Sequence, residues 1–103
     1  MAAEVTYSRE FIPLINDADC AREALAAARE SLGPERVVEA AAPITASEDF
    51  AQFLRQRPGC FALLGTGLEA APLHSPVYDF EDSVLIDGAR WFCAIARRRL
   101  PAA

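Results

Sequence analysis

The chain is 103 residues long, a length that suits one small domain and excludes two full domains. Apolar residues make up 52% of the sequence, which is ample for a core and excludes wholesale disorder. The net charge is −5 and every base is an arginine. An acidic chain without a basic stripe argues against nucleic acid or an anionic membrane as the main partner.

The first expected element is a strand over residues 4–11, where polar and apolar residues alternate. A period of two indicates a strand with one covered face, and Pro13 ends it. Its half-exposed pattern differs from that of the interior strand described below. This difference is consistent with a place in a separate sheet.

A helix is expected over residues 17–32, with Asn16 or Asp17 as its N-cap. Its apolar residues recur at steps of three and four, which indicates one buried stripe. Gly33 followed by a proline is a helix stop signal. Residues 36–40 then form a short predicted strand.

A second helix is expected to open at Ser47, whose side chain would cap it, and to close before Pro58. The segment 60–64 is a continuous apolar run between glycines, which is typical of a strand covered on both faces.

A last helix would begin near Asp82 as its cap and end in three arginines, 97–99, which suit the negative end of a helix. Its inward face is expected to carry Leu85, Gly88, Trp91, Phe92 and Ile95. The element order is therefore β-α-β-α-β-α, and the fold class is α/β.

The single histidine, His74, follows the predicted buried strand, close to where α/β sheets place their sites. An imidazole can bind a metal or act as a general base. Spacing alone favours a solvent-exposed loop histidine, because a catalytic metal needs about three protein ligands and no second histidine exists. Asp79 remains open as a carboxylate that could orient the imidazole.

The three cysteines, Cys20, Cys60 and Cys93, are an odd number and form no CxxC pair. Apolar neighbours predict buried, inert thiols rather than nucleophiles. Free thiols favour a reducing compartment, and no signal peptide or bilayer-spanning run is visible. The expected location is the cytoplasm.

Three segments together resemble the C-terminal end of the aminoacylase/carboxypeptidase-type metal-dependent amidohydrolases. They are ASEDFAQFL at 46–54, PGCFALLGTG at 58–67 and LHSPVYDFED at 73–82. The branch that they resemble contains hippurate hydrolase and the indole-acetyl-amino-acid hydrolases. The segment VTYSREFIPLIND at 5–17 is similar to the family's return from its satellite domain into its catalytic domain.

The resemblance implies that residues 1–13 are the terminal strand of a satellite domain that serves as lid and dimerisation surface. Residues 14–103 would be the C-terminal part of the catalytic α/β domain. In this family that domain binds two divalent metals, zinc or manganese, and a Glu acts as general base. Most of those residues lie in the family's N-terminal part, so the resemblance places no catalytic residue in this chain.

The same resemblance implies that His74 is the family's last metal ligand and that Ser47 and Glu48 line the substrate cleft. Tyr78 and Asp79 match the motif that positions the histidine loop. The sequence departs from the family pattern just before Ser47, where Thr-Ala stands in place of Met-Gly. The loss of a glycine beside the substrate cleft is expected to narrow the cleft.

Two hypotheses follow for function. In the first, the chain is part of an amidohydrolase that cleaves the amide of N-acyl amino acids and is incomplete by itself. In the alternative, it is a non-catalytic truncated remnant that associates with itself or with a partner. Both predict that one imidazole holds no metal pair stably and that exposed apolar faces lead to a homo-oligomer or to packing against a separate polypeptide.

Overall fold

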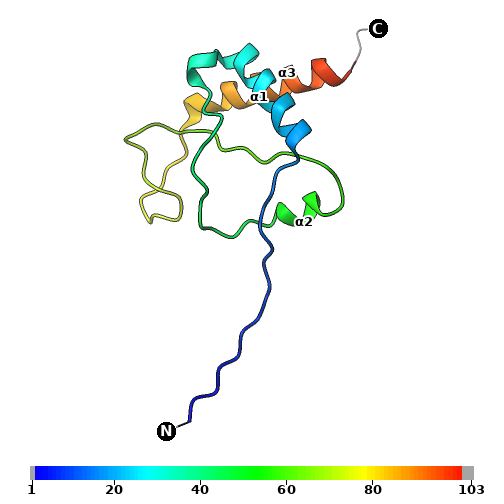
Figure 1. Cartoon of the computed structure of the whole chain (residues 1–103). Coiled ribbons are helices and arrows are strands. Elements are labelled where there is room, and N and C mark those ends of the chain that lie inside the picture. The colour runs from blue at the N-terminus through cyan, green and yellow to red at the C-terminus, as the bar shows by residue number, and fades with distance from the viewer. Residues whose placement is uncertain (1, 101–103) are drawn as a thin grey trace.

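The computed structural model describes residues 2–100 and consists of two long helices, one short helix and extended connections (Figure 1). The elements in chain order are α1 (Ala18–Leu32), the 3₁₀ turn η1 (Pro34–Arg36), α2 (Ala51–Leu54), the 3₁₀ turn η2 (Asp82–Val84) and α3 (Leu85–Arg99). Helix α1 crosses α3, while residues 2–15 extend away from the helix pair as an open segment.

The expected β-α-β-α-β-α arrangement is wrong for this chain by itself, because residues 2–100 contain no strand. The segments 4–11, 36–40 and 60–64 form no ladder with one another or with any other described segment. A strand exists only where a neighbouring backbone accepts and donates its hydrogen bonds. The outer bounds of the expected domains, residue 1 and residues 101–103, lie outside the described residues.

Helix α1 confirms the predicted helix, including its cap and its stop. The Asp17 carboxylate accepts hydrogen bonds from the backbone N–H groups of Asp19 at 3.1 Å and Cys20 at 2.9 Å. Gly33 ends the helix at φ +95°, a backbone conformation that a residue with a Cβ rarely adopts. Local capping therefore sets both ends of α1.

The other two predicted caps are wrong, Ser47 by three residues and Asp82 by one. Ser47 caps no helix; instead the Glu48 carboxylate accepts from the Phe50 backbone N–H at 3.0 Å, and α2 begins only at Ala51. At the last helix, Glu81 rather than Asp82 accepts from the Ser83 N–H, at 3.1 Å.

Helices α1 and α3 pack through small residues. Ala24 and Ala27 of α1 and Ala94 of α3 are buried, which lets the two backbones approach closely. The indole N–H of Trp91 donates to the Ala24 carbonyl oxygen at 2.8 Å. The expected inward residues Gly88, Trp91 and Ile95 are partly buried, whereas Leu85 and Phe92 are 59% and 66% exposed and correct that prediction.

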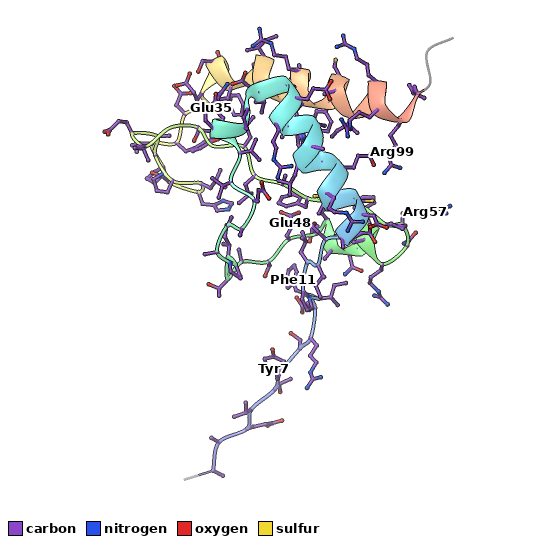
Figure 2. The ribbon with its side chains drawn as sticks, turned by 45° about the horizontal axis from the view of Figure 1, so that its top comes forward. Tyr7, Phe11, Glu35, Glu48, Arg57 and Arg99 are labelled. Atoms are coloured by element: carbon purple, nitrogen blue, oxygen red, sulfur yellow. The ribbon has the colours of Figure 1, made fainter. Side chains whose placement is uncertain are left out.

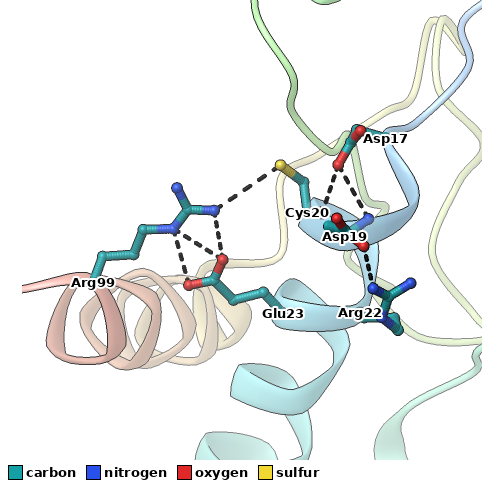
Figure 3. A network of polar contacts seen from close by, with 6 residues as sticks. All are labelled: Asp17, Asp19, Cys20, Arg22, Glu23 and Arg99. Carbon is teal, nitrogen blue, oxygen red and sulfur yellow. Dashed lines mark hydrogen bonds and ion pairs between the residues drawn. The ribbon is translucent and has the colours of Figure 1, made fainter.

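Ion pairs between α1 and α3 flank this apolar contact. Arg98 and Arg99 of α3 reach Glu30 and Glu23 of α1 at 3.0 and 2.5 Å, so they pair across the two helices as well as ending α3. Figure 3 shows two nitrogens of the Arg99 guanidinium donating hydrogen bonds to the Glu23 carboxylate. Exposed pairs of this kind contribute about 0–1 kcal/mol each. They orient the two helices more than they stabilise them.

The one buried charge of the described residues is Asp87, which is 7% exposed. Its carboxylate accepts from the Arg36 guanidinium at 2.5 Å, and Arg90 lies 3.7 Å away. The hydrogen bond from Arg36 lowers the pKa of Asp87. This pair ties η1 to the first turn of α3.

The Asn16 side chain makes the two backbone hydrogen bonds at Phe61 that a neighbouring strand would make in a sheet. Its Nδ2 donates to the Phe61 carbonyl and its Oδ1 accepts from the Phe61 N–H, both at 2.8 Å. Beside it, the Asp17 backbone N–H donates to the Gly59 carbonyl at 3.0 Å. These three bonds hold the extended segment 59–61 against the start of α1.

Much apolar surface of the described residues is uncovered. The radius of gyration is 17.6 Å, whereas a compact domain of this length has about 13 Å. The accessible surface is 9081 Å², against roughly 5,700 Å² expected for a folded monomer of this mass. No helix in residues 2–100 is long and apolar enough to cross a membrane.

Replacing Asn16 by Ala should expose the Phe61 amide to exchange, because both hydrogen bonds to that residue are lost. We expect about 1 kcal/mol of lost protection per bond, measured by hydrogen exchange of the Phe61 N–H by NMR. Asn16→Asp is the matched control, since it keeps the acceptor for the Phe61 N–H and removes only the donor. Equal exchange in all three proteins would contradict the bonding described.

The Arg36–Asp87 pair should make stability depend on acid. A carboxylate with a lowered pKa in the folded state stabilises it above the unfolded pKa, about 3.9, and loses that contribution as the pH falls through the folded value. Asp87→Asn should therefore lower the melting temperature at neutral pH, with the difference from the parent closing below about pH 4.

Circular dichroism at a series of pH values measures this difference. Glu69→Gln changes an exposed loop carboxylate that makes no ion pair within residues 2–100, and serves as the control. A difference between Asp87→Asn and the parent that stays constant across the acid range would contradict the role given to Asp87.

Candidate functional site

His74 lies at the tip of a tight turn in the loop that leads to α3. The Ser75 N–H donates to the Pro72 carbonyl at 3.1 Å, which closes a four-residue turn around Leu73 and His74. His74 has φ +68° and is the single non-glycine residue of 2–100 in the left-handed region. Its side chain is exposed.

A second turn follows directly and fixes the first. The Tyr78 N–H donates to the Ser75 carbonyl at 3.0 Å, and the Val77 N–H donates to the Ser75 hydroxyl at 3.3 Å. Holding a residue with a side chain in the left-handed region costs about 1–2 kcal/mol. The two turns supply the constraint that keeps the His74 backbone in this conformation, and strain of this kind gathers at functional sites.

Ser47 and Glu48 lie on a different loop from His74. Ser47 is exposed and borders a hollow of about 480 Å³ together with Tyr7, Ser8, Arg9, Glu10 and Phe11. Glu48, labelled in Figure 2, is half-buried and bonds to the start of α2. Within residues 2–100, no hydrogen bond or ion pair joins either side chain to His74.

The described residues hold no group of three or more His, Cys, Asp or Glu side chains that could bind a metal ion. His74 therefore supplies at most one ligand, whereas a catalytic zinc site uses about three protein ligands. Asp79 is exposed, and among residues 2–100 it makes no hydrogen bond to the imidazole. The arrangement by itself offers an accessible imidazole and no metal centre.

The cysteines differ in exposure. Cys20 and Cys60 are half-buried, and burial raises the pKa of both thiols, which keeps them protonated near neutral pH. Cys20 lies 4.0 Å from the Arg99 guanidinium in the network of Figure 3. Cys93 is exposed, which corrects the expectation that all three thiols are buried. None of them pairs with His74 as a nucleophile would.

Sequence reasoning missed two features of this region. The left-handed backbone of His74 carries no sequence mark, since neither glycine nor asparagine stands there. A second hollow, of about 390 Å³, lies between the start of α1 and residues 54–59 and includes Asp17, Arg55 and Arg57. No motif marks it, because it forms only where the Asn16 contacts bring the two segments together.

Comparison with known proteins finds similarity to two curated sequences. The chain is 39% identical over 87 residues to IAA-amino acid hydrolase ILR1-like 2 of Arabidopsis thaliana, a match of 82% of this chain and 20% of that protein. It is 33% identical over 98 residues to a putative glutamate–cysteine ligase 2-3 of Rhodococcus jostii (strain RHA1), covering 91% of this chain and 12% of that protein. No solved structure matches.

The chain thus spans a fifth or less of the length of these two relatives. The family comparison covers nearly all of it, because residues 2–98 match the peptidase family M20/M25/M40. Together with the Arabidopsis relative, this match confirms the resemblance to the branch that contains the indole-acetyl-amino-acid hydrolases. The chain belongs to the peptidase family M20/M25/M40 and corresponds to part of a domain of that family.

Proposed function

We propose that this chain is the C-terminal portion of a divalent-metal-dependent amidohydrolase that cleaves the amide bond of an N-acyl amino acid. The name of the Arabidopsis relative, an IAA-amino acid hydrolase, supports this substrate class. The matched residues amount to 20% of that relative. The proposal therefore assigns to this chain some, but not all, of the residues of the active site.

The observation that carries the proposal is the conformation of the His74 loop. The only histidine of the sequence is held in the left-handed region by two successive turns, with its imidazole exposed. A fold retains a strained backbone where the residue has a task that the strain serves. An exposed, rigidly placed imidazole suits a metal ligand.

The residues of this chain do not by themselves fit a metal pair, since His74 is one donor and the described residues form no larger cluster. The proposal therefore gives this chain one ligand to a zinc or manganese ion. The remaining ligands and a general-base Glu would come from a part of the enzyme outside the sequence given. Only with those groups would the metal chemistry of the family be available.

Substrate contact is assigned to the hollow beside Ser47 and to Glu48. A volume of about 480 Å³ suits a small molecule. Its lining combines the Arg9 guanidinium, which can pair with a carboxylate, with the rings of Tyr7 and Phe11. These groups fit the two ends of an N-acyl amino acid, one charged and one apolar.

The uncovered apolar segments support a larger assembly. We assign residues 1–13 to a satellite domain and residues 14–103 to the catalytic domain. In the intact enzyme, the extended segments 36–40 and 60–64 would gain strand partners, and a homo-oligomer or a separate polypeptide would cover exposed surface. All three cysteines are free thiols, which supports a reducing compartment such as the cytoplasm.

The family match and the hydrolase relative favour this proposal over the alternative of a non-catalytic remnant. The two differ in whether His74 matters. For a remnant, the imidazole would be an ordinary exposed side chain with no reason for a strained backbone.

A chimera tests the role of His74. The 87 matched residues of the Arabidopsis hydrolase are replaced by this chain, and hydrolysis of an IAA-amino acid and bound metal are measured. His74→Asn should lower kcat/KM at least about 100-fold and reduce bound metal, because it removes a ligand. Asparagine tolerates the left-handed backbone, so the loop keeps its shape.

Val77→Ala, which changes an exposed side chain of the same loop, is the control and should keep activity and metal. This chain alone, with manganese or zinc added, should not hydrolyse hippurate. Turnover by the isolated chain would contradict the proposal, as would a His74→Asn chimera with full activity and a full metal content.

A further inference from the structure

Ser75 is the residue at which the two turns of the His74 loop meet. It ends the first turn, because its backbone N–H donates to the Pro72 carbonyl at 3.1 Å. It also begins the second turn, because its own carbonyl accepts from the Tyr78 N–H at 3.0 Å. Figure 1 shows this loop in yellow, folded back on itself before α3. The two turns are therefore joined through Ser75.

The side chain of Ser75 adds a bond that the backbone alone would not make. Its hydroxyl oxygen accepts from the Val77 N–H at 3.3 Å. A serine that bonds to the backbone two residues ahead forms a local turn and competes with other conformations of the chain. The second turn is thus closed twice, once at the carbonyl of Ser75 and once at its hydroxyl.

Sequence preference supports the second turn and opposes the first. Serine at the first position and proline at the second are typical of the commonest type of turn, and Ser75 and Pro76 occupy those positions. The proline also restricts the backbone of Ser75 to extended conformations. In the first turn, by contrast, His74 has φ +68° at a position where glycine or asparagine is preferred. The favoured turn therefore directly follows the strained one.

A metal ligand binds well only when its backbone already has the binding conformation. If that conformation is populated only in part, the apparent affinity for the metal falls by the same fraction. A residue with a side chain leaves the left-handed region unless its surroundings hold it there. The bonds at Ser75 act on the neighbour of His74 and oppose that change.

We propose that Ser75 is a positioning residue for the candidate metal ligand His74. Its hydroxyl, bonded to the Val77 N–H, keeps the loop in the conformation that presents the imidazole to the metal. The inference rests on the proposed function, because that function makes His74 a ligand. It assigns the hydroxyl no contact with the metal, since Ser75 acts through the backbone of the loop.

The first test measures the loop in the full chain without metal. Ser75→Ala removes the hydroxyl and leaves the backbone groups of both turns in place. We expect the left-handed conformation of His74 to become less populated, so the NMR chemical shifts of its Cα and carbonyl carbon should move toward ordinary values. Ser75→Thr keeps a hydroxyl and suits an extended backbone, and it should keep the parental shifts.

The second test measures metal affinity in the chimera with the Arabidopsis hydrolase, by competition with a chelator for zinc or manganese. Ser75→Ala should weaken metal binding by about 2- to 10-fold, the factor that corresponds to the loss of one hydrogen bond. Ser75→Thr should restore the parental affinity.

Ser31→Ala is the matched control. It also removes a serine hydroxyl that makes one hydrogen bond, to the Ala27 carbonyl within α1 at 2.8 Å. The control should lower the melting temperature, measured by circular dichroism, and leave the metal affinity unchanged. A loss of affinity confined to Ser75→Ala therefore separates positioning of the ligand from general stability.

The outcomes distinguish this inference from the proposed function. The positioning role alone is overturned if Ser75→Ala keeps the parental shifts of His74, or keeps full metal affinity in a chimera that loses metal on His74→Asn. Failure of Ser75→Thr to restore an affinity that Ser75→Ala weakens would also overturn it, because the hydroxyl would then not be the cause. A His74→Asn chimera with a full metal content would overturn both.

Discussion

The close packing of α1 against α3 is the constraint on which the rest of this structure depends. Alanines at the contact let the two backbones approach, and the indole N–H of Trp91 bonds to a carbonyl of α1. Further long-range contacts reinforce this crossing: two arginines of α3 pair with acids of α1, and Asp87 holds η1. Small side chains give proximity but bury little area, so the pair orders the chain without building a full core.

The shortage of buried area connects the fold with the function. Within residues 2–100, extended segments with strong apolar character lie without strand partners, and one face of α3 is uncovered. The same chain supplies a single imidazole where a metal site would use several ligands. The core therefore lacks packing partners, and the candidate site lacks metal ligands. Both shortages have one cause, because in this family the described segment is part of a larger domain.

The candidate site shows where sequence patterns carry information and where they do not. The motif around His74 indicates the family, but nothing in it signals the left-handed backbone, which arises from two turns acting together. Likewise, the pattern Ser47-Glu48-Asp49 indicates a helix start. In the structure no side chain of residues 2–100 caps α2: Glu48 bonds to the Phe50 N–H just ahead of the helix, which begins only at Ala51.

The sequence by itself determined what local interactions decide: the bounds of α1, which its Asp17 cap and the Gly33 stop set, and the family, which three motifs in order indicate. Only the tertiary structure decided whether the apolar segments pair. The segment 60–64 has the composition of a buried strand, yet it bonds to the Asn16 side chain at one residue and, among the residues that the structure describes, to no strand. The reason is physical: a helix satisfies its own backbone, whereas a strand requires a neighbour.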